Sequence, residues 1–126
     1  MQAEPPLVEI SFTNEFKHRL QSLSKKYRRI RSDIQPIIEQ LQTGETPGDQ
    51  ISGTGTTTFK VRVKNSNIKK GKSAGYRIIY QVLSPTSIVL LTIYSKSDQT
   101  DISVTKIQQI LSEFEQQSEG EETEEE

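Results

Sequence analysis

The stretch FKVRVKNSNIKKGKSAGYRIIYQVLSPTSIVLLTIY, residues 59–94, decides the fold of this chain. Its first part alternates strictly between apolar and basic residues, and this period of two predicts a strand over residues 57–64 with one buried face. Residues 76–83 and 88–94 are rich in β-branched and aromatic residues, which predicts two more strands. The Ser-Pro-Thr-Ser sequence of residues 84–87 is typical of a hairpin turn. Three consecutive strands of this kind favour an antiparallel sheet.

Two amphipathic helices are expected before this sheet. Residues 7–11 alternate as a first strand would, and Thr13 is a suitable N-cap for the first helix. A second helix that begins near Ser32 or Asp33 places Pro36 in its first turn, whereas one that begins earlier would kink there. Glycines and prolines within residues 44–55 predict an irregular loop. The apolar stripes of the two helices are Phe12, Phe16, Leu20, Leu23 and Tyr27, and then Ile30, Ile34, Ile37, Ile38 and Leu41.

The C-terminal part of the chain divides into a helix and a tail. Apolar residues recur at helical spacing over residues 102–114, which predicts a last helix. Residues 116–126 have almost nothing to bury, so they are expected to be a disordered acidic tail behind a domain of residues 1–115. The order β–α–α–β–β–β–α predicts an α+β fold. In it, two N-terminal helices pack on a mostly antiparallel four-stranded sheet, and a C-terminal helix follows.

Charge is distributed unevenly along the chain. The formal net charge is −1, but the eight glutamates from Glu113 onward leave nine acids against sixteen bases in residues 1–112, a charge of +7. A basic domain favours polyanionic partners such as RNA, DNA or an acidic protein.

Several classes of protein are disfavoured by composition. The absence of cysteine excludes disulfides and thiolate metal sites, and a single histidine, His18, argues against a histidine-built metal site. The sequence contains neither an apolar run long enough to span a bilayer nor a signal-peptide pattern at its start. We therefore expect a soluble cytoplasmic protein that needs neither a metal nor another cofactor and has no membrane partner.

The region of residues 59–77 is the main candidate for binding RNA, because it contains seven bases and no acid. The alternative is a solvated strand whose lysines protect a sheet edge. Arg77 favours binding, because it interrupts the otherwise apolar strand YRIIYQV. Aromatic side chains in the strands either stack on bases or belong to the core, and the core is the expectation for Tyr76 and Tyr80. The seven bases are Lys60, Arg62, Lys64, Lys69, Lys70, Lys72 and Arg77.

Other polar residues carry weaker signals. His18 is expected to be exposed on the first helix rather than to act as a base. Asp98 and Asp101 pair with Lys96, or Asp101 caps the last helix, and capping is the favoured interpretation.

The segments FKVRVK, GKSAGYRIIYQV and IVLLTIYSKSDQTDIS resemble the RelE/ParE toxin superfamily, and in particular its HigB-like branch. The stretch PIIEQLQTGETPGDQISG is similar to the helix and loop that precede the sheet in that branch. The resemblance extends over about residues 7–111, nearly the whole domain. It implies a small RelE-like α+β domain. The motifs identify the superfamily better than they identify the molecule on which the protein acts.

The resemblance also implies an activity and a set of residues. RelE-like proteins are metal-independent mRNA interferases that cut mRNA in the ribosomal A site, where basic side chains hold the scissile phosphate and the 2′-hydroxyl attacks it. Lys60, Arg62, Arg77 and Lys96 match the bases of this site, and Tyr94 is in place to supply an aromatic hydroxyl. The chain departs from the best-known RelE toxins at two positions, which are Ser97 in place of an arginine and Ser103 in place of a tyrosine.

Three functions stay open at this point. The first is a ribosome-dependent endoribonuclease, with the ribosome, mRNA and a neutralising antitoxin as partners. The second is a ParE-like inhibitor of DNA gyrase, because one fold serves both activities. The third is a degenerate module that binds RNA or protein without catalysis. The basic strand favours the first function, and Ser97 and Ser103 favour the third.

Overall fold

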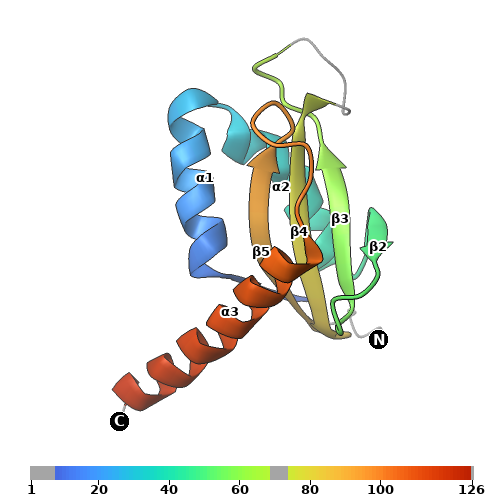
Figure 1. Ribbon diagram of the computed structural model, residues 1–126. Helices are drawn as coiled ribbons and strands as arrows, with labels where there is room; N and C mark the ends of the chain where they lie inside the picture. The colour runs from blue at the N-terminus through green and yellow to red at the C-terminus, as the bar shows by residue number, and fades with distance from the viewer. Residues whose placement is uncertain (1–7, 69–73, 126) are drawn as a thin grey trace, which may run out of the picture.

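The computed structural model describes residues 8–68 and 74–125, with side chains described as far as residue 116. The described elements form one mixed sheet and three helices (Figure 1). The sheet has five strands in the order β1-β5-β4-β3-β2, of which only the β1–β5 pair is parallel. The elements are β1 (Glu9–Phe12), α1 (Asn14–Lys26), α2 (Ile30–Gln42), β2 (Asp49–Ile51), β3 (Thr58–Val63), β4 (Tyr76–Ser84), β5 (Ser87–Ser95) and α3 (Val104–Glu125).

The two faces of the sheet bury different cores, because neighbouring residues of a strand point to opposite sides. One core contains Ile78 and Ile93 with the apolar stripes of α1 and α2. The other contains Ile79 and Leu91 with the first turns of α3. Figure 1 shows α2 behind the sheet and α3 crossing in front of it. Tyr76 and Tyr80 are fully buried in the first core, as expected from their place in an apolar strand.

The predicted α+β class is confirmed, but the sheet has five strands rather than four. The additional strand, β2, lies within the glycine-rich segment that was expected to be an irregular loop. Its Asp49 and Gln50 pair with Lys60 and Phe59 of β3. Three residues are too few to produce a periodic pattern, so only pairing with β3 reveals this strand.

Of the two starts that the sequence leaves open for the second helix, the structure has the earlier one. α2 begins at Ile30 and keeps Pro36 inside it. Ile30 and Ile34 are buried, so packing against the sheet stabilises the extra turn. Pro36 is exposed, and its nitrogen cannot donate the backbone hydrogen bond to Ser32 that an interior helix residue would make.

The backbone of residues 116–125 is helical in the structure, although the sequence predicts a disordered tail there. α3 continues to Glu125, and glutamate and glutamine have favourable helix propensities that support such an extension. The proposed domain boundary at residue 115 stays a prediction.

Candidate functional site

Strand pairing aligns two arginines and a tyrosine across the three central strands, near one end of the sheet. Arg62 of β3 lies opposite Arg77 of β4, and Arg77 lies opposite Tyr94 of β5. Directly opposed residues of antiparallel strands project from the same face, here the face covered by α3. Lys60 projects from this face as well, because it lies two residues before Arg62 and opposite Ile79. We call Lys60, Arg62, Arg77, Tyr94 and Lys96 the basic site.

Arg77 is the most buried charge of the basic site, with 5% of its surface exposed. Its Nη1 donates a hydrogen bond of 3.2 Å to the carbonyl oxygen of Tyr76. Burial lowers the pKa of the Arg77 guanidinium from its usual value, and the nearby charge of Arg62 lowers it further, whereas Tyr94 and Asp101 act in the opposite direction. A bound phosphate would relieve both the burial cost and the repulsion between the two arginines.

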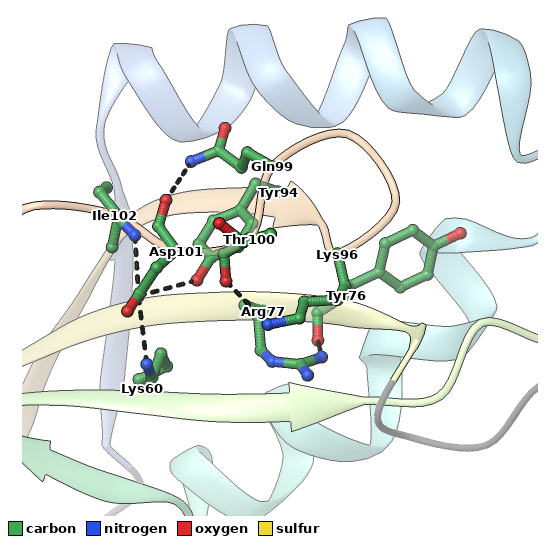
Figure 2. A network of polar contacts seen from close by, with 9 residues as sticks. All are labelled: Lys60, Tyr76, Arg77, Tyr94, Lys96, Gln99, Thr100, Asp101 and Ile102. Carbon is green, nitrogen blue, oxygen red and sulfur yellow. Dashed lines mark hydrogen bonds and ion pairs between the residues drawn. The ribbon is translucent and has the colours of Figure 1, made fainter.

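A loop of residues 96–102, the site loop, folds over the ends of β4 and β5 (Figure 2). Lys96 Nζ donates to the carbonyl oxygen of Thr100 at 2.9 Å, and Gln99 Nε2 donates to the carbonyl oxygen of Asp101 at 3.0 Å. On its outer side, Asp98 forms an ion pair of 3.4 Å with Lys26 of α1. These contacts hold the Lys96 side chain of the basic site and define the path of the loop.

Asp101 places a carboxylate within the basic site. Its Oδ1 accepts from the backbone nitrogen of Ile102 at 2.8 Å and from Lys60 Nζ at 3.2 Å, and the Tyr94 hydroxyl lies 3.5 Å away (Figure 2). The hydrogen bond from Ile102 is the main cause that lowers the pKa of the Asp101 carboxyl, and Lys60 and Lys96 lower it further against the effect of burial.

These contacts correct the sequence-based interpretation of the two aspartates. The N-cap of α3 is Ser103, whose hydroxyl accepts from the backbone nitrogen of Lys106 at 3.1 Å, so Asp101 does not cap this helix. Asp98 pairs with Lys26 rather than with Lys96. Neither the contact of Asp101 with Lys60 nor that of Asp98 with Lys26 has a signal in the local sequence, because the partners lie 41 and 72 residues apart.

Tyr94 retains its proton at neutral pH. Its side chain is buried, and this burial, together with the charge of Asp101, raises the pKa of the Tyr94 hydroxyl to about 12. The group is therefore suited to donate a proton or a hydrogen bond, and not to act as a general base near neutrality.

Protein stability is expected to fall as the pH rises from about 10 towards 12. The unfolded chain releases the Tyr94 proton near its ordinary pKa of about 10, whereas the folded chain holds it to a pKa of about 12. The loss of stability at high pH should therefore be smaller in Tyr94→Phe than in the native protein, because the variant has one tyrosine proton fewer whose release is linked to unfolding. Urea unfolding of both proteins at pH 8 and pH 11 measures the difference. Equal losses in the two proteins would contradict the buried, neutral state of Tyr94.

The remaining predicted residues lie farther from this cluster or outside the described residues. Lys64 is exposed at the end of β3, where it lines a hollow together with Asp33, Pro36 and Arg62. Lys69, Lys70 and Lys72, the other predicted RNA-binding residues, lie outside the described residues. His18 is exposed on α1, as expected.

Two kinds of feature are absent from the parts of the chain that the structure describes. No three His, Cys, Asp or Glu side chains there are grouped so that they could hold a metal ion. No helix among the described residues has the length and apolar character needed to cross a membrane.

The arrangement of three helices on a mixed sheet is the RelE-like α+β fold that the resemblance of the sequence implies, with five strands in place of the four expected. A solved structure of the Escherichia coli toxin RelE, a double arginine-to-alanine mutant in the free state, is similar to this chain with a TM-score of 0.50. The two chains are 14% identical, and the similarity covers 88% of this chain and 97% of that chain. No protein-family model matches the sequence. At this level of identity, the likeness establishes the shared fold.

Proposed function

We propose that this protein is the toxin of a toxin–antitoxin pair, and that it cleaves mRNA bound to the ribosome. The observation that carries this proposal is the alignment of Arg62, Arg77 and Tyr94 across three strands, with Lys60 on the same face. Such a surface suits an RNA backbone, because guanidinium groups can bind two phosphate oxygens at once and ammonium groups add positive charge. Similarity to the fold of a known toxin supports the proposal.

In the proposed reaction, the 2′-hydroxyl of the RNA attacks the adjacent phosphorus. A bond forms between the 2′-oxygen and phosphorus, the bond to the 5′-oxygen breaks, and a cyclic phosphate and a 5′-hydroxyl result. Arg77 and Arg62 stabilise the charge that develops on the phosphate oxygens. Tyr94 keeps its proton at neutral pH and is available to protonate the leaving 5′-oxygen, while the 2′-hydroxyl proton passes to water. Lys96 adds positive charge at the rim.

The finer parts of the proposal follow from the resemblance of the sequence. The chain is assigned to the HigB-like branch, the active domain comprises residues 1–115, and the protein acts in the cytoplasm without a cofactor. Its partners are the ribosome with its mRNA and an antitoxin that covers the basic site. An acidic or otherwise complementary antitoxin surface fits the +7 charge of residues 1–112.

Induction of the protein in a bacterial host, with primer extension to map mRNA 5′ ends, tests the proposal. New ends at in-frame codon positions are expected with the native protein and not with Arg62→Ala, an exposed position where substitution leaves the core intact. Growth arrest with intact mRNA would instead indicate gyrase or another target. Absence of arrest would indicate a binding module without catalysis.

RNA affinity is expected to depend strongly on salt. Each phosphate contact on single-stranded RNA contributes about 0.7 to the slope of log affinity against log salt concentration, so Arg62→Ala should lower the slope by about that amount. Fluorescence anisotropy of a labelled, 2′-O-methylated RNA measures the slope without cleavage. Lys17→Ala on exposed α1 is a control with the same change of charge, and it should leave the slope unchanged. Equal slopes in all three proteins would remove Arg62 from the RNA contact.

A further inference from the structure

Asp101 contributes a negative charge to a site whose other charged side chains are all basic, and the fold of α3 does not require it there. Ser103 caps the helix, and Asp101 lies two residues before that cap. Its carboxylate nevertheless turns towards β3 and β5, where its Oδ1 lies between Lys60 and Tyr94 (Figure 2). The position of this carboxylate therefore calls for an explanation within the basic site.

The groups around Oδ1 are those that bind a phosphate oxygen. A backbone N–H from Ile102, an ammonium from Lys60 and a phenol from Tyr94 approach this one oxygen at 2.8, 3.2 and 3.5 Å. Protein contacts to nucleic-acid phosphates are drawn from this same set of donors, and charged donors make the strongest of them. A carboxylate oxygen held in this way occupies a place suited to an RNA phosphate oxygen.

We propose that the Asp101 carboxylate stands in for an RNA phosphate in the resting protein and competes with that phosphate for Lys60 and Tyr94. That the competing anion is an RNA phosphate rests on the proposed function. That some anion can replace the carboxylate depends only on the three donors around Oδ1. When RNA binds, the Asp101 carboxylate turns outward, and the RNA phosphate accepts the hydrogen bonds of Lys60 and Tyr94 in its place. Asp101 thereby lowers the affinity of the site for RNA and acts as a built-in attenuator.

The ion pair is placed so that a phosphate can displace it. The Lys60 side chain is 32% exposed and the Asp101 side chain is 64% exposed, and exposed ion pairs of this kind contribute little to stability. The site loop is also held by contacts that do not involve the Asp101 carboxylate, namely those of Lys96 with Thr100 and of Gln99 with the Asp101 carbonyl. The carboxylate is thus free to rotate without unfolding the loop.

A positioning role for Asp101 predicts the opposite result. If the carboxylate served to hold Lys60 and Tyr94 in place for RNA, its removal would weaken binding and slow cleavage. Competition predicts that removal of the negative charge tightens binding. Asp101→Asn separates the two roles, because the amide keeps an oxygen acceptor for Ile102 while it removes the charge.

Asp98→Asn is the matched control, because it makes the same change of charge in the same loop. Asp98 pairs with Lys26 on the outer side of the site loop, away from Lys60 and Tyr94. We expect Asp101→Asn to bind 2′-O-methylated RNA about three to ten times more tightly than the native protein, and Asp98→Asn to differ less than about twofold. Thermal unfolding should show that both variants keep the native stability.

A second probe separates failure of this inference from failure of the proposed function. Titration with inorganic phosphate, followed by NMR at the Ile102 backbone amide, reports on the anion position itself. Equal or weaker RNA binding by Asp101→Asn than by Asp98→Asn would overturn the competition. Suppose that neither the native protein nor the two variants bind RNA, but phosphate shifts the Ile102 signal at a lower concentration in Asp101→Asn than in the native protein. This result would support the anion site and contradict the proposed RNA function. If phosphate leaves the Ile102 signal unchanged in all three proteins, the proposed anion site is wrong.

Discussion

Arg77→Met is expected to reduce RNA cleavage by about 10²- to 10³-fold, the loss typical when one stabiliser of transition-state charge is removed. Arg77 is 5% exposed and lies between Arg62 and Tyr94 in the sheet, so under the proposed function its charge would act on the RNA phosphate in surroundings that screen it poorly. Methionine keeps an unbranched apolar stem of similar length and removes the charge. Single-turnover cleavage of an RNA substrate, measured on ribosomes, gives the rate.

Folding must be checked in the same experiment, because Arg77 also donates to the Tyr76 carbonyl oxygen. Circular dichroism and thermal unfolding should show that Arg77→Met remains folded, since relief from a buried charge offsets the lost hydrogen bond. Arg77→Lys is the matched variant that keeps a charge but not the planar fork, and it should retain part of the activity. Full activity in a folded Arg77→Met protein would remove this residue from the reaction.

Gly75→Ala is expected to destabilise the protein by more than about 3 kcal/mol and to abolish its activity with it. A Cβ atom at Gly75 would lie 2.0 Å from the backbone carbonyl oxygen of Val63, so β3 and β4 would have to separate. The neighbouring pair Val63–Tyr76 and the pair Arg62–Arg77 belong to the same ladder and would lose their alignment. Urea unfolding measures the loss of stability.

Gly53→Ala is the control for this substitution. Gly53 has a positive φ of 85°, but a Cβ there meets nothing within 4 Å, so only backbone strain of about 1–2 kcal/mol is expected. The carbonyl oxygen of Gly75 also accepts a hydrogen bond of 2.9 Å from the backbone nitrogen of Lys96. A shift of Gly75 would therefore also disturb the start of the site loop. If Gly75→Ala lowered the free energy of unfolding no more than Gly53→Ala does, β3 and β4 would have to accommodate the added Cβ atom with little cost.

Prediction from sequence succeeded where the pattern was local and long. The alternation of residues 57–64 gave the faces of β3, and the apolar stripes gave both N-terminal helices, because burial imposes a period of two on strands and about 3.6 on helices. It missed β2, and it left the start of α2 open between two alternatives. In both cases contacts with distant elements decided the outcome, through pairing with β3 and through packing of Ile30.

The sequence by itself determined which side chains are available to the candidate site. It placed Lys60 and Arg62 on one side of a strand and Arg77 as a lone charge in an apolar strand, because the pleat alternates whatever the strand later pairs with. Only the tertiary structure decided which of these charges meet. The register of β3 on β4 puts Arg62 opposite Arg77, and the site loop brings Asp101 to Lys60 across 41 residues of sequence. Strand register and loop position depend on the packing of the whole chain, so no local pattern encodes the carboxylate within the basic site.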